Sequence, residues 1–299
     1  MKIETLCAIC KSRPPSTVVY RERIDAATFT ADTFSARRQP DRRHYQWVRC
    51  DACGLMRSDP VEDVDLASLY ASSTFDYSNE TDGLKETYRA LARRALGGAS
   101  ASGTVLEIGG GNGFFLDAVA QDGFDRFVEV EPSRQAVDQA SALVREHAIC
   151  DIMRPGLVPD GSVDLVAMFH VLDHLPDPRS VLETAFASLK PGGHIVIAVH
   201  DVEAWSARLM KERSPIFDVE HTYLYSRTTG PQLLASAGFS DVRAGTYANR
   251  YSGAYLLHLA PFPSVLKGSA PYRSVSQLAR RVRFTLPLGN MWIAGRRAS

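Results

Sequence analysis

The sequence predicts an α/β fold with a mostly parallel sheet, preceded by a small module that contains four cysteines. Three observations support this prediction. An apolar run that begins at Val105 breaks into a glycine-rich turn at residues 109–113, and a helical pattern follows directly. Strand and helix patterns then alternate as far as Tyr247. Two Cys-x-x-Cys pairs lie upstream, within residues 1–60.

The composition is that of a globular protein able to bury a sizeable core, because 45% of its 299 residues are hydrophobic. The 34 basic side chains are balanced by 34 acidic ones, so no net charge attracts nucleic acid or an anionic membrane. The N-terminus lacks the apolar core of a signal peptide, and no apolar run is long enough to span a membrane. We therefore expect a cytoplasmic protein.

Residues 1–60 are expected to form a zinc-binding module. Each Cys-x-x-Cys turn can direct two thiolates at one metal ion, and four thiolates suit tetrahedral Zn²⁺. A redox pair or buried structural thiols are alternatives, but neither would stabilise the polar segment between the pairs. His44 lies in that segment among arginines and is expected at the surface, not as a ligand. The predicted ligands are Cys7, Cys10, Cys50 and Cys53.

Residues 61–103 are expected to form a linker and a packing helix. Tyr70 and Tyr77 lie in a polar, Ser-rich loop, either because this loop packs on the next domain or because it covers a substrate. Apolar side chains recur at helical spacing over residues 84–96, and Gly97 ends the pattern. We expect this helix to pack beside the first strand.

The glycine turn is suited to a ligand that approaches the backbone. Gly109, Gly111 and Gly113 have no Cβ atoms, and the helix that follows offers unpaired N–H groups. A dinucleotide fingerprint would need a further glycine where Phe114 stands, which disfavours NAD. The next strand ends at Glu131, roughly 20 residues past the turn, where nucleotide-binding sheets hold ribose hydroxyl groups.

The remaining elements continue the alternation, with Pro, Ser and Asp at helix starts and a Lys-Pro-Gly-Gly turn before the fifth strand. We expect strands at residues 127–130, 148–150, 163–169 and 194–199 and one that ends at 247, with helices at 132–145, 178–189, 203–211 and 228–237.

The alternation of Glu107 with the three glycines resembles the acidic-x-Gly-x-Gly-x-Gly motif of class I S-adenosylmethionine (SAM) methyltransferases. This resemblance, over about residues 84–247, implies a Rossmann-like sheet of seven strands that binds SAM. It implies that Asp151 faces the adenine amino group, with Ile152 beside the ring, and that Phe169 borders the cofactor. After the fourth strand the family usually has His-x-x-Glu-His, where this chain has His170, Asp173 and His174.

The tail completes the predicted domain, which spans residues 104–299. Residues 291–294 are expected to form the antiparallel seventh strand that the resemblance implies, so residues 250–286 become an insertion before it. That insertion is partly apolar and rich in arginine. It could line a pocket, contact a second subunit or lie on a membrane surface.

Methyl transfer to a hydroxyl group or a carbon acid needs a base within hydrogen-bond reach of the acceptor. The first choice is His221 with Glu220, since this loop histidine stands beside a carboxylate and aromatic residues. A histidine that only fastens the loop is the alternative. Further candidates are His170 and His174 after the fourth strand and Tyr77 in the linker.

The four cysteines and the domain together resemble methyltransferases of sugar and glycan biosynthesis, which implies O-methylation of a sugar or a sugar-containing metabolite. Sugar C-methylation is the alternative within this resemblance, but such enzymes have a further large C-terminal domain, for which we expect too little room in this length. An RNA methyltransferase is a rival, but balanced charge and the sequence Phe-His-Val-Leu-Asp-His after the fourth strand disfavour it. A non-catalytic protein that binds SAM and a partner is the other rival. The sequence leaves the oligomeric state open.

Overall fold

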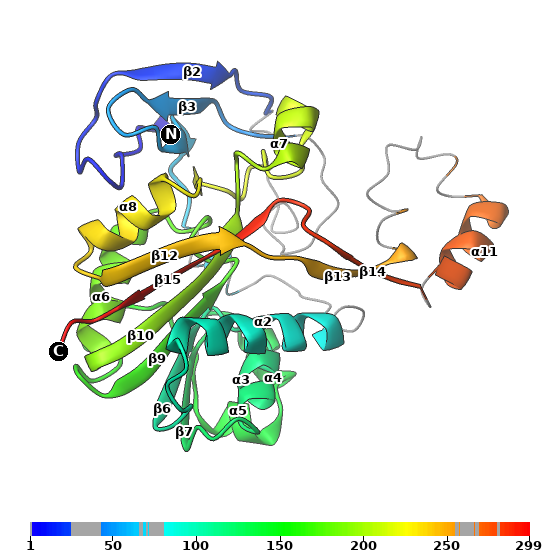
Figure 1. Ribbon diagram of the computed structural model, residues 1–299. Helices are drawn as coiled ribbons and strands as arrows, with labels where there is room; N and C mark the ends of the chain where they lie inside the picture. The colour runs from blue at the N-terminus through cyan, green and yellow to red at the C-terminus, as the bar shows by residue number, and fades with distance from the viewer. Residues whose placement is uncertain are drawn as a thin grey trace.

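The computed structural model describes residues 2–24, 43–65, 68–69, 71, 81–254, 257, 266, 269–279 and 282–299. A seven-stranded sheet forms the centre of the molecule (Figure 1). From edge to edge its strands are β12 (Ser240–Thr246), β15 (Asn290–Arg296), β10 (Leu189–His200), β9 (Val163–Phe169), β6 (Thr104–Ile108), β7 (Arg126–Val130) and β8 (Ala148–Ile149).

The strands from β10 to β8 pair in parallel, and β15 runs antiparallel to both of its neighbours. All five residues of β6 are buried, as are all but one in β9. Such continuous burial arises because helices cover both faces of a parallel sheet. The predicted α/β fold with a Rossmann-like seven-stranded sheet is therefore confirmed.

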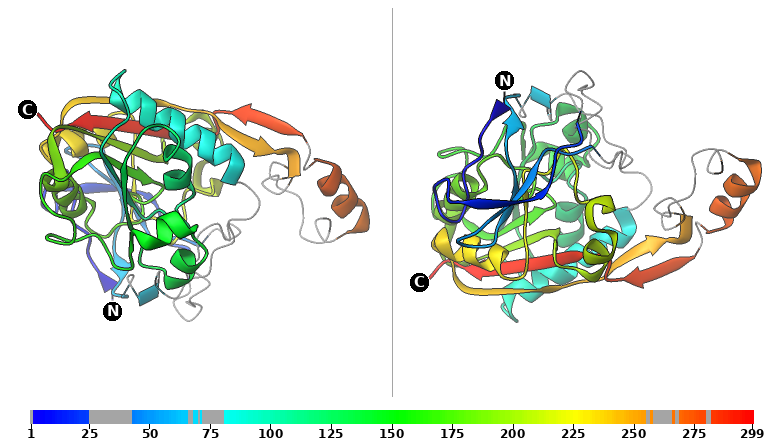
Figure 2. Two further views of the ribbon diagram at one scale, coloured as in Figure 1. Left: turned by 90° about the horizontal axis from the view of Figure 1, so that it is seen from below. Right: turned by 90° about the horizontal axis from the view of Figure 1, so that it is seen from above.

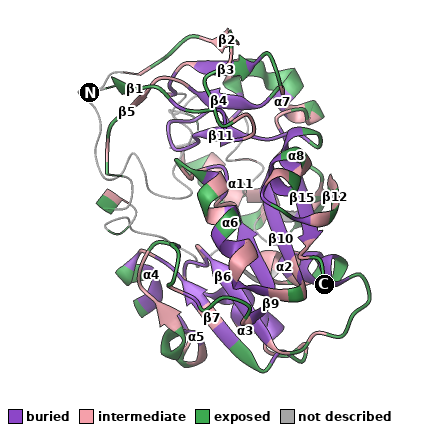
Figure 3. Cartoon of the chain, turned by 90° about the vertical axis from the view of Figure 1, so that its left-hand side faces the viewer, coloured by how far each residue is buried: buried purple, intermediate pink, exposed green. Residues whose placement is uncertain are grey.

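Helices pack on both faces of the sheet (Figure 3). One face packs on α2 (Thr81–Leu96), α3 (Phe114–Val119) and α5 (Ala142–Glu146), and the other on α6 (Pro178–Ser188) and α8 (Thr229–Ser236). The packing helix α2 was expected beside the first strand. The side chains of α2 share a core cluster with Val105 of that strand, β6, and the helix also contacts α3, β10 and the hairpin strand β13.

The segment after Glu131 differs from the prediction of one helix. It forms two short helices, α4 (Arg134–Asp138) and α5. Ser133 caps the first by accepting a hydrogen bond from Ala136 N, and Ser141 caps the second by accepting one from Val144 N. A serine at 141 that bonds the backbone three residues on restarts the helix instead of continuing it.

The N-terminal module and the central domain share a small sheet. Its strands are β2 (Ser16–Tyr20), β3 (Trp47–Cys50), β4 (Met56–Ser58) and, from the central domain, β11 (Tyr223–Leu224), while β1 (Lys2–Ile3) pairs with β5 (Val61–Glu62). Trp47 packs edge-on against Phe217, with ring centroids 5.6 Å apart. His44 is fully buried, which corrects the expectation of a surface position; its Nδ1 lies 2.8 Å from the carbonyl oxygen of Tyr45.

The described residues of the predicted insertion belong to an arm that projects from the sheet (Figure 2). The strands β13 (Asn249–Ser252) and β14 (Arg283–Leu286) pair antiparallel and lead to α11 (Ala270–Ala279), in which no residue is buried. The remaining helices, α7 (Trp205–Met210) and the short 3₁₀ turn η3 (Lys211–Arg213), lie beside the module. Among the described residues, no helix is both long and apolar enough to cross a membrane.

Candidate active site at the carboxyl edge of the sheet

The predicted site residues gather where the parallel strands end. In an open α/β sheet, ligands bind outside the carboxyl ends of the strands, where the loops have freedom to form a crevice. The glycine turn follows β6, and Glu131 follows β7. Asp151 comes shortly after β8, His170 follows β9, and His200 is the last residue of β10.

The glycine turn has the backbone that the sequence predicted. Gly109, Gly111 and Gly113 have φ angles of 69°, 65° and 66°, which side chains other than glycine adopt rarely. A Cβ atom on Gly109 would lie 2.5 Å from Cγ2 of Val171. The glycines therefore let the loop after β9 pack directly against the turn.

Glu131 ties the turn to the next helix. One carboxylate oxygen accepts a hydrogen bond from Gly111 N at 2.9 Å and the other accepts one from Ser133 N at 2.8 Å. The side chain is buried at the tip of β7. A carboxylate fixed beside the glycine turn suits the predicted contact with a ribose hydroxyl.

Two further glutamates lie behind the turn. Glu107 and Glu129 are opposite each other in the β6–β7 pairing and are both buried. Burial, reinforced by the neighbouring carboxylates, raises the pKa of Glu129 to about 10 and that of Glu107 to about 8. These shifts favour the protonated, neutral form of both groups. Glu129 was missed from the sequence, although it alternates with Glu131 along β7 and so shares its face.

The residues predicted around the adenine have mixed outcomes. Asp151 follows β8, and its carboxylate pairs with Arg154 at 2.8 Å, which lowers the pKa of Asp151. Ile152 is 46% exposed and leaves an apolar side chain for a ring to cover. Phe169 is a core residue, because its ring stacks on Tyr88 with centroids 4.0 Å apart. The ring of Phe169 is thus engaged with α2, and a role at the cofactor would fall to its backbone.

Four histidines surround one aspartate at the ends of β9 and β10. We call this group the histidine–aspartate cluster; its members are His170, Asp173, His174, His200 and His221. Nε2 of His174 and Nε2 of His221 each lie 3.9 Å from a different carboxylate oxygen of Asp173. The ring centroid of His200 is 4.8 Å from that of His170 and 5.3 Å from that of His221.

Each histidine ring of the cluster is oriented by a hydrogen bond to a neighbouring group. Nδ1 of His221 lies 2.8 Å from the carbonyl oxygen of Ile216, and Nδ1 of His200 lies 3.1 Å from Oδ1 of Asn290. His174 donates to the carbonyl of Glu220, and Nε2 of His170 lies 3.1 Å from the hydroxyl of Tyr247. Burial lowers the pKa of His174 to about 4 and that of His221 well below its usual value. These imidazoles are neutral at neutral pH.

The cluster changes the predicted pairing of His221. The sequence paired this histidine with Glu220, whereas the described carboxylate that faces its Nε2 belongs to Asp173. Glu220 is also buried and contributes its backbone carbonyl to His174. Tyr70 and Tyr77 lie outside the described residues. His200 was missed, although its position at the end of a buried strand is the signal that identified the others.

The four predicted zinc ligands lie together beside the shared sheet. Their sulfur atoms are all within 4.8 Å of one another, with Cys7 3.4 Å from Cys53 and Cys10 3.8 Å from Cys50. Thiolates at about 2.3 Å from a tetrahedral ion would be roughly 3.8 Å apart. The geometry therefore fits one Zn²⁺ ion.

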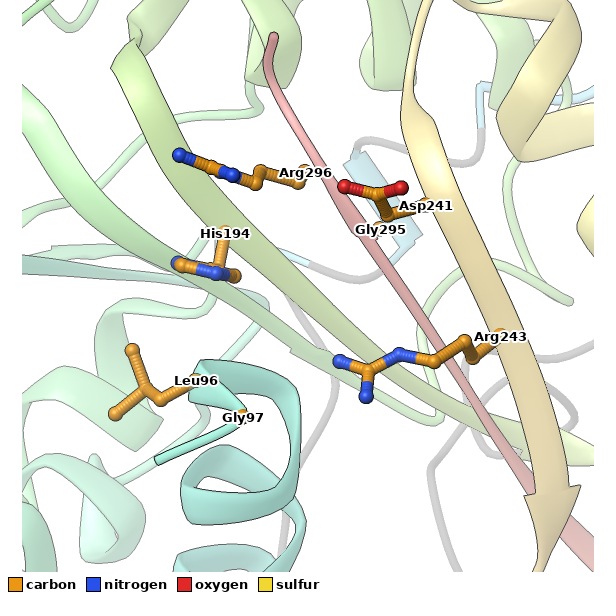
Figure 4. Close-up of a pocket in the computed structure, with 7 residues that line it drawn as sticks. All are labelled: Leu96, Gly97, His194, Asp241, Arg243, Gly295 and Arg296. Carbon is orange, nitrogen blue, oxygen red and sulfur yellow. The ribbon is translucent and has the colours of Figure 1, made fainter. Parts of the chain in front are cut away.

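A surface pocket of about 380 Å³ lies at the opposite edge of the sheet (Figure 4). Its polar side chains include Arg243, Arg296 and His194, which stands at the amino end of the paired part of β10. Burial, followed by these two arginines, lowers the pKa of His194. The amino edge of a parallel sheet is not where such folds bind a nucleotide, so this pocket is separate from the candidate site.

Comparisons with known proteins find similar chains. A ubiquinone biosynthesis O-methyltransferase from Pectobacterium carotovorum is 30% identical over 34% of this chain and 45% of its own length. A probable S-adenosylmethionine-dependent methyltransferase from Mycolicibacterium smegmatis is 29% identical over 51% of this chain and 56% of its own. The chain thus spans about half the length of these curated relatives. A SAM-dependent methyltransferase from Archaeoglobus fulgidus aligns with a TM-score of 0.47 at 19% identity, over 71% of this chain and 94% of that one.

The family model described as a methyltransferase domain matches residues 82–244. The match begins in α2, contains every parallel strand from β6 to β10, and ends within β12. It therefore includes the glycine turn, Glu131 and all members of the histidine–aspartate cluster. Because the match extends over more than half of the chain, the chain belongs to the methyltransferase domain family.

Proposed function

We propose that the protein transfers the methyl group of SAM to an oxygen atom of a small acceptor. The observation that carries this proposal is the position of the histidine–aspartate cluster directly beside the glycine turn. Val171, within the loop that bears three members of the cluster, packs against Gly109. A cofactor on the turn and an acceptor at the cluster would therefore be neighbours, as in-line transfer requires.

The residues at the turn fit SAM. Three glycines with positive φ open the backbone, and Glu131 offers a fixed carboxylate to the ribose. Asp151 and Ile152 would border the adenine. SAM supplies an electrophilic methyl group on a sulfonium, so the chain has to bind and orient the two substrates, exclude water and accept a proton.

The proton of an acceptor hydroxyl would pass to an imidazole of the cluster as the oxygen–methyl bond forms. Neutral imidazoles are available for this step because burial keeps their pKa values low. His221 is the first candidate, and Asp173 faces it where Glu220 had been expected. Tyr77 stays a predicted contributor to acceptor binding.

An oxygen acceptor is supported by the similarity to O-methyltransferases named for ubiquinone biosynthesis. The resemblance described from the sequence adds a sugar or sugar-containing metabolite as the acceptor class. Among the described groups of the site, imidazoles and carboxylates can hydrogen-bond adjacent hydroxyl groups, which a polyhydroxylated acceptor offers.

The test is to incubate the full chain with labelled SAM and a panel of sugar nucleotides, lipid-linked sugars, phenolic acceptors and RNA. We expect label in an oxygen acceptor, and a loss of kcat of about a hundredfold or more in His221→Gln with SAM affinity unchanged. His147→Ala is the matched control, because His147 is exposed at the C-cap of α5. Transfer to RNA alone, or to no acceptor, would contradict the proposal.

We also propose that Cys7, Cys10, Cys50 and Cys53 hold a structural Zn²⁺ ion. The spacing of their sulfur atoms supports this. Elemental analysis should find zinc bound through these cysteines, and changing one of them should unfold the module. Freshly purified protein without zinc would contradict the assignment.

A further inference from the structure

Asp173 is a buried carboxylate that no neighbouring side chain satisfies. Its side chain is fully buried, and neither oxygen makes a hydrogen bond of normal geometry, although the backbone amides of Asp173 and His200 lie close enough to favour the anion. An unpaired carboxylate in the interior is costly. Such a group needs a proton or a cation beside it.

The distances around Asp173 are too long for hydrogen bonds. Nε2 of His174 and Nε2 of His221 are each 3.9 Å from a carboxylate oxygen. A charge-assisted hydrogen bond would bring these atoms to about 2.8 Å. Ligands held about 2.1 Å from one shared ion, by contrast, lie roughly 3.4 to 4.2 Å apart. One ligand atom from each of the three residues lies within 4.8 Å of the others, so the observed separations fit ligands that share an ion better than a hydrogen-bonded base and carboxylate.

The histidines are oriented as metal ligands usually are. A ligating imidazole donates its other ring N–H to a carbonyl or carboxylate oxygen, which fixes the tautomer and the direction of the free nitrogen. His221 makes this bond with the carbonyl of Ile216, and His174 makes it with the carbonyl of Glu220. Nε2 of His174 faces Oδ1 of Asp173, and Nε2 of His221 faces Oδ2 of the same carboxylate.

We propose that Asp173, His174 and His221 bind a divalent transition-metal ion. Two imidazoles and one carboxylate form a ligand set for Zn²⁺, Fe²⁺ or Co²⁺, and three protein ligands leave coordination positions open. His170 and His200 also lie near Asp173. This site is distinct from the four cysteines.

The role of the ion rests on the proposed function, whereas its binding does not. An acceptor hydroxyl bound at an open position would have a lower pKa, because the cation stabilises the alkoxide. Its proton would then pass to His170 or His200, since His221 would be occupied as a ligand. This arrangement deepens the proposal of oxygen methylation by assigning the step that activates the acceptor.

The test uses the full chain and Co²⁺ as the probe. Wild-type protein is incubated with excess Co²⁺, desalted and analysed for total metal and for its absorption spectrum. We expect two ions per chain, counting the thiolate site, and one in Asp173→Asn and in His221→Gln. The ion lost from these variants should give weak d–d bands without the intense thiolate charge-transfer band. His147→Ala should keep both ions.

Folding is checked separately through thermal unfolding and SAM affinity. Asp173→Asn removes an unpaired buried charge, so the variant should fold, and added Zn²⁺ should raise Tm in the wild type but not in Asp173→Asn. A wild type that holds no more metal than Asp173→Asn overturns the inference. Methyl transfer by such single-ion protein would leave the proposed function standing. Two bound ions without transfer to any acceptor would instead contradict the proposed function alone.

Discussion

Gly113 is the residue at which the glycine turn tolerates change least. Its φ is 66°, and a Cβ atom there would lie 2.3 Å from Cγ1 of Val144 and 2.5 Å from Oε2 of Glu129. Both neighbours are buried, so neither can move away easily. The turn is thus constrained by the core beneath it.

We predict that Gly113→Ala lowers the free energy of unfolding by about 3 kcal/mol or more, because overpacking adds to the strain of a positive φ. Gly156→Ala is the control: its φ is 80°, yet nothing lies within 4 Å of the added Cβ. That variant should lose only about 1 kcal/mol. Urea unfolding measures both, and equal losses would contradict the packing argument.

The buried glutamates make stability depend on pH. The pKa of Glu129 is raised to about 10 and that of Glu107 to about 8, from 4.5 for an unperturbed glutamate. Between pH 4.5 and the folded pKa of each group, the folded state binds more protons than the unfolded state. The stability that these two glutamates contribute is therefore fully present below about pH 4.5, and it is lost as the pH rises through their folded pKa values.

We predict that Glu129→Gln removes part of this loss. Each group contributes up to about 1.4 kcal/mol per pH unit, so the variant should gain on the wild type between about pH 6 and about pH 9. Urea unfolding across this range measures the difference. Glu146→Gln, at an exposed position, should follow the wild type. Parallel curves for Glu129→Gln and the wild type would show that Glu129 is ionised when folded.

At the scale of elements, β4 connects the module to the candidate site. Ser58 is fully buried, its Oγ donates to the carbonyl of His221 at 3.0 Å, and its amide donates to the carbonyl of Thr222. Thr222 in turn donates its amide to the carbonyl of Asp173. A strand of the cysteine module thus holds the loop that carries His221 in register with Asp173.

We predict that Ser58→Ala lowers kcat severalfold while SAM affinity stays unchanged, because the freed carbonyl of His221 no longer fixes the loop. The buried hydrogen bond is worth about 1 kcal/mol of stability. Ser162→Ala removes an exposed hydroxyl that also donates to a carbonyl, and should change neither parameter. If the kcat of Ser58→Ala equals that of Ser162→Ala and of the wild type, β4 does not position the loop that carries His221.

Local patterns predicted the elements better than the contacts between them. The glycine turn and Glu131 follow from spacing along the chain, because strand ends in a parallel sheet converge on one edge. The approach of Asp173 to His221 brings together residues 48 positions apart, through the pairing of β11 with β4, and no periodicity indicates that. The burial of His44 and the helix boundary at Ser141 likewise depend on tertiary contacts and on capping, and neither can be read from composition.

At the scale of the whole molecule, the arm stands apart from the sheet. None of the residues of α11 is buried, and the arm joins the body through the β13–β14 hairpin (Figure 2). Val275 and Leu278 are among its exposed apolar side chains. Three roles predicted for this arm are distinguished by the next experiment: lining a pocket, contacting a second subunit and lying on a membrane surface.

We predict that replacing residues 253–282 with an Asn-Gly turn leaves Tm within about 2 °C of the wild type and SAM affinity unchanged, because Ser252 and Arg283 already pair across the hairpin. Calorimetry and thermal unfolding measure both. Acceptor KM, molecular mass in solution and binding to anionic vesicles then identify which contact the arm makes. A large fall in Tm would show that the arm supports the core.

The position of β15 has a consequence for how the chain is made. This strand lies between β10 and β12, although it begins 90 residues after the end of the first and 44 residues after the end of the second. During synthesis both neighbours must wait on the ribosome with unpaired edges until residues 290–296 emerge. A nascent chain that stalls before residue 290 would display two open strands, so translation speed between residues 246 and 296 should govern how much of the protein escapes aggregation in the cell.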